Sequence, residues 1–203
     1  MNNVDLNEVY PREHLSINTS QFKYHPRMAQ IIGVGGCGCN IINEMFHIAE
    51  YTIPDALFAI VDNDNKAICN IDVPQKYFAE TLLDGVKQII GESIRLLFIV
   101  AGMGGKYSAP MVSELCRQFH DDVDKANEFV KMSIVFSVMP FDFEGKKRGI
   151  KAEASVNMIR KHATRVIILE NESICRRPDL SPEEGLKQMT KCISDYIKLF
   201  MGN

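Results

Sequence analysis

The chain has 203 residues, of which 46% are hydrophobic, and its formal net charge is −3. This length is enough for one sizeable core in a single domain, and the lack of a basic excess argues against nucleic acid as the main partner. No apolar stretch is long enough to span a membrane, and the polar N-terminus is unlike a signal peptide, so we expect a cytoplasmic protein.

Apolar runs and helical periodicities alternate from residue 28 onward. Continuous apolar runs predict the buried strands of a parallel sheet that is covered on both faces, and apolar residues spaced three and four apart predict helices. In chain order, the predicted elements are strand 28–33, helix 40–50, strand 56–61, helix 79–90, strand 96–101, helix 109–119, strand 132–138, helix 151–162, strand 166–169 and a helix that starts after Ser181 and runs through Phe200.

This alternation predicts a doubly wound α/β fold with a mostly parallel sheet and helices on both faces. We predict one domain over residues 28–203, preceded by an N-terminal extension over residues 1–27 that is rich in turn signals. The last predicted helix carries an apolar stripe, which either covers the sheet, as we expect, or forms a dimer or partner surface. The stripe consists of Leu186, Met189, Ile193, Ile197 and Phe200.

The six cysteines do not form a recognisable metal site. Most lie in apolar segments, where cysteine behaves as a small hydrophobic residue, and without a secretion signal we expect reduced thiols. Cys37 and Cys39 are separated by one residue, whereas paired zinc ligands usually have two or more residues between them, and neither a second pair nor a histidine cluster completes a site. We therefore predict no metal centre.

A glycine-rich segment, Gly33-Val34-Gly35-Gly36-Cys37-Gly38-Cys39-Asn40, joins the first predicted strand to the first predicted helix. Glycines in this position let backbone N–H groups approach a phosphate, and the start of the helix contributes a partial positive charge. The segment therefore predicts a phosphate cradle, although a tight turn that merely requires glycines is the simpler alternative.

The cradle alone does not identify its ligand. Gly33, Gly35 and Gly38 fit the G-x-G-x-x-G pattern of dinucleotide-binding proteins, and Asp62 ends the second predicted strand, where an acidic residue binds a ribose hydroxyl in such enzymes. A Rossmann-type enzyme that binds NAD or FAD, or an adenylating enzyme that uses ATP, is therefore one interpretation.

Four segments, in order and at comparable spacing, resemble the FtsZ/tubulin family, and the resemblance runs from about Met28 to about Phe200. The longest match is the nine-residue segment that begins at Pro140, which differs from the usual FtsZ segment only at Asp142, where Asn is common. The four segments are Gly33 to Asn40, Ala59 to Ala67, Phe98 to Gly105 and Pro140 to Arg148.

The resemblance implies a Rossmann-like N-terminal domain that binds GTP or GDP, with Mg²⁺ accompanying the nucleotide. It implies that Glu144 contacts the sugar and that Arg148 lies at the guanine and ribose side, which suits a carboxylate acceptor and a forked donor. An ordinary salt-bridged loop is the alternative for these two residues. The other implied site residues are Gly35, Gly36, Gly38 and Asn40 in the cradle, Asp62, Asn63 and Asp64 along the pocket, and Gly102, Gly104 and Gly105 in a second phosphate wall.

The second glycine segment departs from the family pattern. After Gly105 the family continues through Gly-Thr-Gly-Thr-Gly, whereas this chain reads Lys106-Tyr107-Ser108 before Ala109-Pro110 and is about three residues shorter. Such loops wrap phosphates with backbone N–H groups, so a shorter loop should wrap less. Lys106 either compensates as a point charge on a phosphate or is an ordinary exposed lysine.

Other departures concern the first glycine segment and the last helix. Cys37 and Cys39 replace family glycines, at a cost of about 1 kcal/mol wherever positive φ is needed. Alignment on Ser181 places Thr190-Lys191 at the family's guanine-reading Asn-Asp pair, and a shift of one turn places Ser194-Asp195 there instead. Because a lysine only donates hydrogen bonds, guanine preference is in doubt.

The chain ends at Asn203, before the family's catalytic acidic loop and second domain, so we predict no catalytic residue and weak or no GTP hydrolysis alone. The expected partners are a guanine nucleotide and either a second copy or an FtsZ-like protein, in filament or cell-division-type assembly. A nucleotide-free FtsZ-like scaffold that acts through protein contacts is the other alternative.

Overall fold

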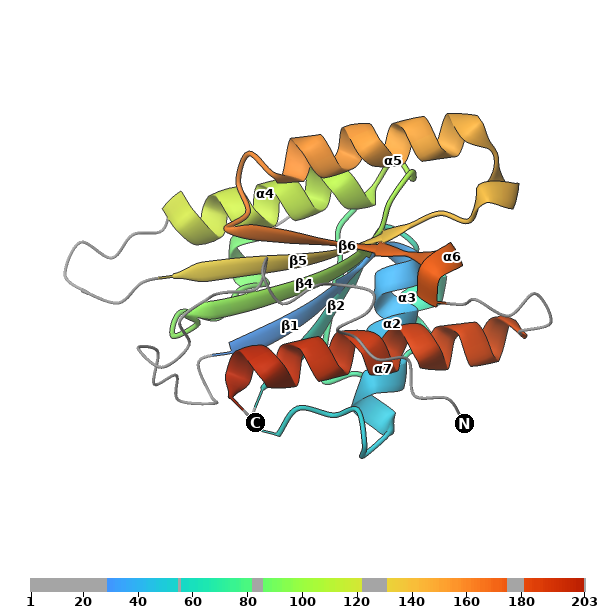
Figure 1. The fold of residues 1–203 in the computed structure, drawn as a ribbon. Helices are drawn as coiled ribbons and strands as arrows, with labels where there is room; N and C mark the ends of the chain where they lie inside the picture. The colour runs from blue at the N-terminus through green and yellow to red at the C-terminus, as the bar shows by residue number, and fades with distance from the viewer. Residues whose placement is uncertain (1–28, 55, 82–85, 122–130, 175–180, 203) are drawn as a thin grey trace.

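The computed structural model describes residues 29–54, 56–81, 86–121, 131–174 and 181–202. It contains a six-stranded sheet in which every strand pair is parallel, with the order β3-β2-β1-β4-β5-β6 (Figure 1). The predicted doubly wound α/β fold is thus confirmed. The strands are β1 Ala29–Val34, β2 Leu57–Asp62, β3 Gln75–Phe78, β4 Leu96–Gly102, β5 Met132–Met139 and β6 Arg165–Glu170. The predicted extension over residues 1–27 lies outside the described residues.

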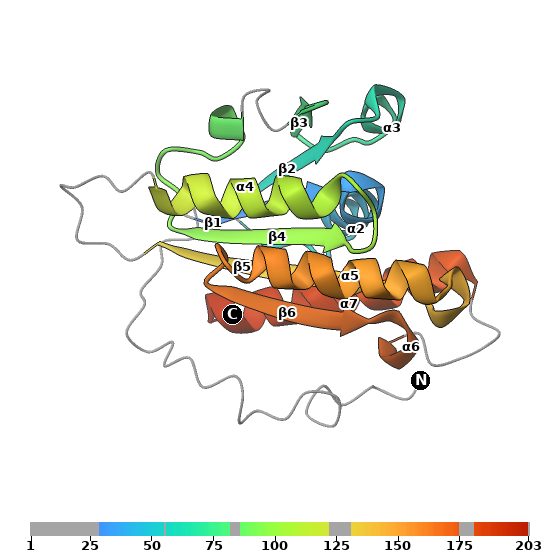
Figure 2. The same ribbon diagram turned by 90° about the horizontal axis from the view of Figure 1, so that it is seen from above.

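Helices cover both faces of the sheet, with α2 and α7 on one side and α4 and α5 on the other (Figures 1 and 2). The longer helices are α2 Gly35–His47, α4 Ser108–Asp121, α5 Lys146–Ile159 and α7 Pro182–Met201, and the short ones are α3 Asn65–Cys69, η4 Val86–Gln88, η5 Asp142–Glu144 and α6 Asn171–Ile174. Within the described residues, no helix has both the length and the apolar character that crossing a membrane requires.

Each face of the sheet carries its own apolar core. Alternating strand residues divide between the faces, so that Phe98 and Phe136 pack toward α2 and α7 while Ile99 and Val135 pack toward α4 and α5. The stripe of α7 belongs to the first core: Ile193 and Ile197 are fully buried and Met189 is nearly so. The prediction that this stripe covers the sheet is therefore confirmed.

Several parts of the secondary structure differ from expectation, including the start of α2 at Gly35 instead of 40 and the short helices α3 and α6, which were not predicted. The helix predicted over 79–90 is wrong in its described part, where only the short turn η4 Val86–Gln88 is helical. The strand β3 was not predicted, because its four residues alternate between partly buried and exposed positions at the sheet edge. The helix α5 starts at Lys146 rather than at 151, so the basic end of the Pro140 to Arg148 segment forms its first turn.

The last helix has the start that its sequence predicts. The Ser181 hydroxyl accepts from the Glu184 N–H at 3.2 Å, and a Glu184 carboxylate oxygen accepts from the Ser181 N–H at 2.9 Å. This reciprocal capping box satisfies two backbone donors, and Pro182 occupies the first turn, where its missing N–H costs nothing. The cap fixes where α7 begins beside the sheet.

Candidate functional site

The two glycine segments meet where the strand order reverses. Because β1 pairs with both β2 and β4, the crevice between the carboxyl ends of β1 and β4 is the point where ligands of this fold class bind. The helices α2 and α4 both start at this edge, directly after Val34 and Tyr107. Two helix N-termini, each with unpaired N–H groups and partial positive charge, therefore lie beside each other.

The glycines of the first segment have three different surroundings: two lie in close contact with backbone, one has a positive φ, and one faces open space. A Cβ on Gly38 would lie 2.2 Å from the Val100 carbonyl oxygen, and a Cβ on Gly33 would lie 2.5 Å from the Gly38 oxygen, so these two glycines let α2 pack directly on the sheet. Gly35 has φ of +70°, and a Cβ there would meet the Ser108 Oγ at 2.5 Å. Gly36 is exposed, with open space where a Cβ would be.

The contacts of these glycines add a packing role to the predicted one. Gly38, which we predict to cradle phosphate, also lets α2 contact β4, because a side chain at this position would meet the Val100 oxygen. Gly36, in the first turn of α2, has the open surroundings that a cradle requires. The contact between Gly35 and Ser108, which joins the starts of α2 and α4, was not anticipated from the sequence. Asn40 is exposed on α2.

Both cysteines of the segment lie within α2, after its positive-φ first residue Gly35, in helical backbone where φ is negative, so the expected strain does not arise. Cys39 is buried, and its Sγ lies 3.6 Å from the Val61 oxygen and 3.7 Å from the Gly33 oxygen. Burial raises the pKa of the Cys39 thiol to about 12. It is therefore a packed, protonated thiol.

Cys37 lies in the crevice itself. Its Cβ and Sγ would be 2.7 and 3.1 Å from a Cβ on Gly102, so the side chain rests against the end of β4. Although the residue keeps exposed surface, desolvation raises its pKa to about 11, with Glu144 adding to the rise and Arg148 opposing it. The thiol thus lies among the starts of α2, the second glycine segment and the Pro140 to Arg148 segment.

The second glycine segment is arranged around Arg148. Gly104 has φ of +87°, and a Cβ there would meet the Arg148 Cγ at 2.8 Å, so the arginine side chain passes directly over this glycine. Gly105 and Lys106 are exposed, and a Cβ on Gly105 would meet nothing within 4 Å. Lys106 forms no ion pair with the described residues. Gly105 therefore offers the same open backbone as Gly36.

Glu144 and Arg148 form an ion pair, with the Arg148 Nε 3.1 Å from a Glu144 carboxylate oxygen. The other Glu144 oxygen accepts from the Phe141 N–H at 2.8 Å. A nearby bond, from the Asp142 N–H to Glu172 at 2.9 Å, ties the segment to α6 and was not foreseen. The structure thus brings this predicted pair to the crevice, in the salt-bridged arrangement that was weighed as its alternative.

The acidic loop after β2 bonds mainly to its own backbone. Asp62 is 5% exposed, and its Oδ1 accepts from the N–H groups of Asn63 at 2.7 Å and Asp64 at 3.2 Å. Asp64 caps α3 by accepting from the N–H groups of Lys66 and Ala67. Among the residues that the structure describes, no cluster of three or more His, Cys, Asp or Glu side chains is arranged to hold a metal ion.

The side chains of α7 that were aligned with guanine-reading residues have local roles. Thr190 is fully buried, Lys191 donates to Asp195 at 2.8 Å, and the Ser194 hydroxyl donates to the Tyr51 oxygen at 2.7 Å. The Thr190 Oγ1 is buried and has no hydrogen-bond partner within the described residues, so the first alignment leaves one acceptor of α7 unpaired. Three further polar residues, Glu170, Asn171 and Glu172, lie at the junction of β6 and α6 and were not predicted as site residues from the sequence.

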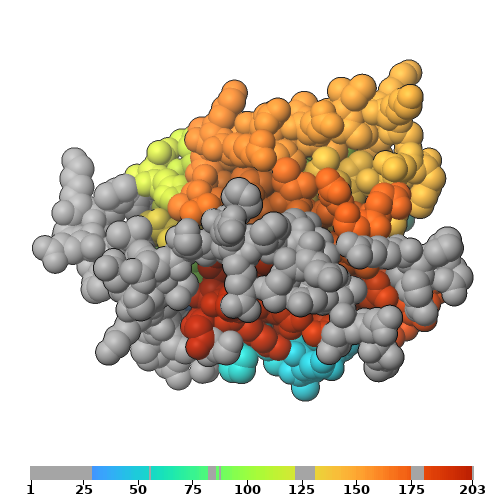
Figure 3. Space-filling view, in the orientation of Figure 1, coloured from blue at the N-terminus to red at the C-terminus, as the bar shows by residue number. Residues whose placement is uncertain are grey.

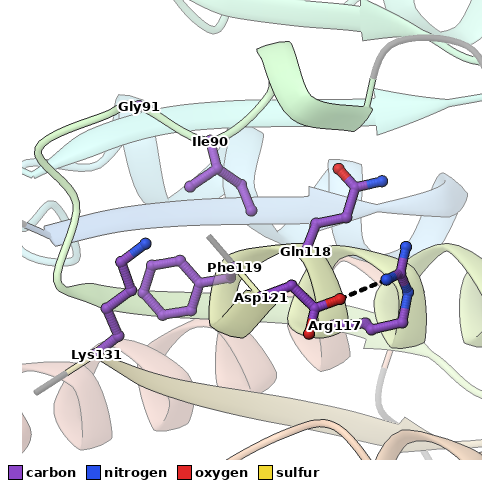
Figure 4. A pocket seen from close by; sticks show the side chains of 7 residues that line it. All are labelled: Ile90, Gly91, Arg117, Gln118, Phe119, Asp121 and Lys131. Atoms are coloured by element: carbon purple, nitrogen blue, oxygen red, sulfur yellow. Dashed lines mark hydrogen bonds and ion pairs between the residues drawn. The ribbon is translucent and has the colours of Figure 1, made fainter. Parts of the chain in front are cut away.

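A separate cavity of about 340 Å³ opens at the other end of the strands, where β4 and β5 begin (Figure 4). It lies near the amino ends of β4 and β5, and the Lys131 ammonium is 5.3 Å from the centre of the Phe119 ring. Because the glycine segments lie at the carboxyl ends, this cavity is not part of the crevice. It is lined by Ile90, Gly91, Arg117, Gln118, Phe119, Asp121 and Lys131.

A surface ion network beside this cavity gives a pH prediction. Hydrogen bonds from the Arg117 guanidinium lower the pKa of Glu114 to about 2. A carboxyl group whose pKa is lower in the folded state contributes stability above its unfolded pKa, and this contribution is lost as pH falls from about 5 toward 2. Glu114→Gln should therefore show a shallower loss of stability over this range in urea unfolding followed by circular dichroism. The exposed Glu153→Gln is the control, and equal slopes for both variants would contradict the assignment.

These features define a Rossmann-like α/β domain in which two glycine segments meet at the topological switch point. No protein-family model matches the chain. Among curated proteins it is 28% identical to cell division protein FtsZ from Wolbachia sp., over 75% of this chain and 44% of that protein. It is 25% identical to mitochondrial division protein fszB from Dictyostelium discoideum, over 97% of this chain and 57% of that protein. The chain thus spans about half the length of these relatives.

Solved structures agree on the fold. An FtsZ dimer subunit from M. jannaschii has a TM-score of 0.71 at 16% identity, covering 100% of this chain and 61% of that chain. CetZ2 from Haloferax volcanii, in a GTPγS-bound protofilament, has a TM-score of 0.69 at 16% identity, covering 85% of this chain and 57% of that chain. The chain is related to the FtsZ/tubulin family over the region of that family's N-terminal domain.

Proposed function

We propose that this chain binds a guanine nucleotide, GTP or GDP, in the crevice between β1 and β4. The observation that carries the proposal is the contact between Gly35 at the start of α2 and Ser108 at the start of α4. Two helix N-termini that meet at a switch point form an anion site, because their free N–H groups and dipoles point toward the same space. Open backbone at Gly36 and Gly105 gives phosphates room to approach.

The residues fit a nucleotide in a definite order. The phosphates would take the N–H groups around Gly36 and Gly105, with Lys106 as a mobile countercharge. The sugar and base would lie toward Glu144 and Arg148, whose mutual ion pair would open as ribose hydroxyls and ring acceptors replace it. Mg²⁺ would enter with the phosphates, since the nearby Asp62 and Asp64 each use a carboxylate oxygen to hold their own loop.

We propose that hydrolysis by this chain alone is slow. Phosphoryl transfer depends on a group that positions the attacking water. The carboxylates nearest the crevice are engaged: Asp62 and Asp64 accept from backbone N–H groups, and Glu144 is held by Arg148 and Phe141. The partners that we propose are a second copy or an FtsZ-like protein, in keeping with relatives named for division and with the dimer and protofilament structures.

Calorimetry on nucleotide-stripped protein tests the proposal. We expect micromolar binding of GTP and GDP, weaker binding of ATP and none of NAD. Gly105→Val should weaken GTP binding at least tenfold, because its side chain would fill space that is open in the structure. Gly149→Ala on α5 is the control: an added Cβ there also meets nothing within 4 Å, and this variant should bind like the parent.

The competing functions give different results in the same experiment. Binding of NAD or ATP in preference to GTP would support a Rossmann-type enzyme, for which the crevice geometry is also suited. Failure of all four ligands to bind the folded protein would refute the nucleotide proposal. The scaffold function would then be the better explanation, since Glu144 and Arg148 already neutralise each other and do not require a ligand.

A further inference from the structure

The outward face of α5 carries an apolar line that the core does not use. The inner face of this helix is buried against the sheet through Ala152, Ser155, Val156 and Ile159. On the opposite face, Ile150 is 67% exposed and Met158 is 42% exposed, with the exposed Ala154 between them. Residues four apart lie above one another on a helix, so these three side chains form a continuous line.

Basic residues surround this line, although the chain as a whole is acidic. Residues 146–161 contain six Lys and Arg side chains and a single acid, Glu153, whereas the formal net charge of the chain is −3. Arg148 is paired with Glu144 on the inner side. The others are exposed and form no ion pair with the described residues; they are Lys146, Lys147, Lys151, Arg160 and Lys161.

We propose that this face of α5 docks on an anionic lipid surface. In the space-filling view α5 forms the upper rim of the molecule, and its side chains project outward (Figure 3). Lysines on such a ridge can reach phosphate headgroups with their flexible stems, while Ile150 and Met158 enter the boundary between headgroups and acyl chains. Phe143, in the short turn η5 that precedes α5, is 83% exposed and stacks on Phe141.

The charges and the spacing argue against other occupants. A second copy of the same face would place like charges against each other. A partner helix would need an apolar seam at alternating spacings of three and four residues. Those positions on the outward face are Lys147, Ile150, Ala154, Asn157 and Lys161, of which two are apolar. A lipid surface needs no such seam, because headgroups are mobile and charge alone gives most of the attraction.

Vesicle sedimentation with the full chain tests the proposal. We expect binding to phosphatidylcholine vesicles that contain phosphatidylglycerol, little binding to phosphatidylcholine alone, and weaker binding at high salt. Lys151→Glu with Lys161→Glu should weaken binding by at least about twentyfold, from roughly fivefold per basic residue. Ile150→Ser with Met158→Ser should weaken it at unchanged charge. Lys66→Glu with Lys76→Glu, exposed residues near the β3 edge, is the charge-matched control and should bind normally.

Three outcomes would overturn the proposal. The first is no binding to the anionic vesicles at low salt. The second is an equal loss in the control variant, which would mean that overall charge decides. The third is equal binding to soluble polyglutamate with no effect of the serine variant, which would assign the face to an acidic macromolecule instead. Circular dichroism of each variant establishes that the helix is intact.

Discussion

Replacing Gly38 with alanine is expected to lower the free energy of unfolding by about 3 kcal/mol, at the upper end of the usual cost of overpacking. The added Cβ would lie 2.2 Å from the Val100 carbonyl oxygen, far inside contact distance. Because the Cβ is bonded directly to the α2 backbone and the oxygen belongs to the β4 backbone, neither can rotate away, and α2 must shift from β4. The gain of about 0.5–1 kcal/mol that alanine gives over glycine in a helix is too small to offset this strain.

Urea unfolding followed by far-UV circular dichroism measures this effect, since the chain has no tryptophan for fluorescence. Gly149→Ala is the matched control, because it also places alanine at a helical glycine but meets nothing within 4 Å. We expect that control to be neutral or slightly stabilising. A Gly38 variant as stable as the parent would show that α2 and β4 are less closely packed than the structure has them.

The result also bears on how nucleotide binding is tested. A bulky residue at Gly38 would abolish binding by disturbing the fold, so it cannot separate loss of a ligand contact from loss of structure. Gly36, two residues earlier, has open surroundings and can be substituted without that disturbance. The glycine-rich sequence could not distinguish the two, because both fit the same pattern and differ only in what faces them.

The architecture was predictable because each strand is a continuous apolar run. Ile31, Ile60 and Phe98 lie in such runs and become the centre of the sheet, and helical periodicity located the helices on both faces. Failures fell where that signal is weak. Residues 75–78 alternate at the sheet edge and were missed as a strand, and within the described part of 79–90 the only helical residues are the short turn Val86–Gln88.

The meeting point of the candidate site's segments was predictable, but the contacts of each residue were not. The segments at the carboxyl ends of β1, β4 and β5 meet as expected, since parallel strands bring these ends to one edge. What the sequence could not show is that Arg148 passes over Gly104 or that Ser108 faces Gly35. These contacts depend on positions in three dimensions that no local pattern encodes.

Gly36→Asp is expected to have opposite effects on stability and on nucleotide binding. The first turn of α2 contains no acidic residue, and a carboxylate there would interact favourably with the helix dipole by about 0.3–1 kcal/mol. The same charge would face the phosphates. A repulsion of about 3 kcal/mol, within the roughly 4 kcal/mol expected for unit charges 4 Å apart near a protein surface, corresponds to more than a hundredfold loss of GTP affinity.

The comparison with Gly36→Asn isolates the charge, because asparagine has nearly the same shape. Thermal unfolding without nucleotide should rank the aspartate variant at or above the parent, while calorimetry should find GTP binding strongly reduced in the aspartate variant and less so in the asparagine variant. Nucleotide should then raise the melting temperature of the parent but not of Gly36→Asp, since a ligand stabilises only the state that binds it. Unchanged GTP affinity in Gly36→Asp would place the phosphates away from α2 and remove the main support for the proposed site.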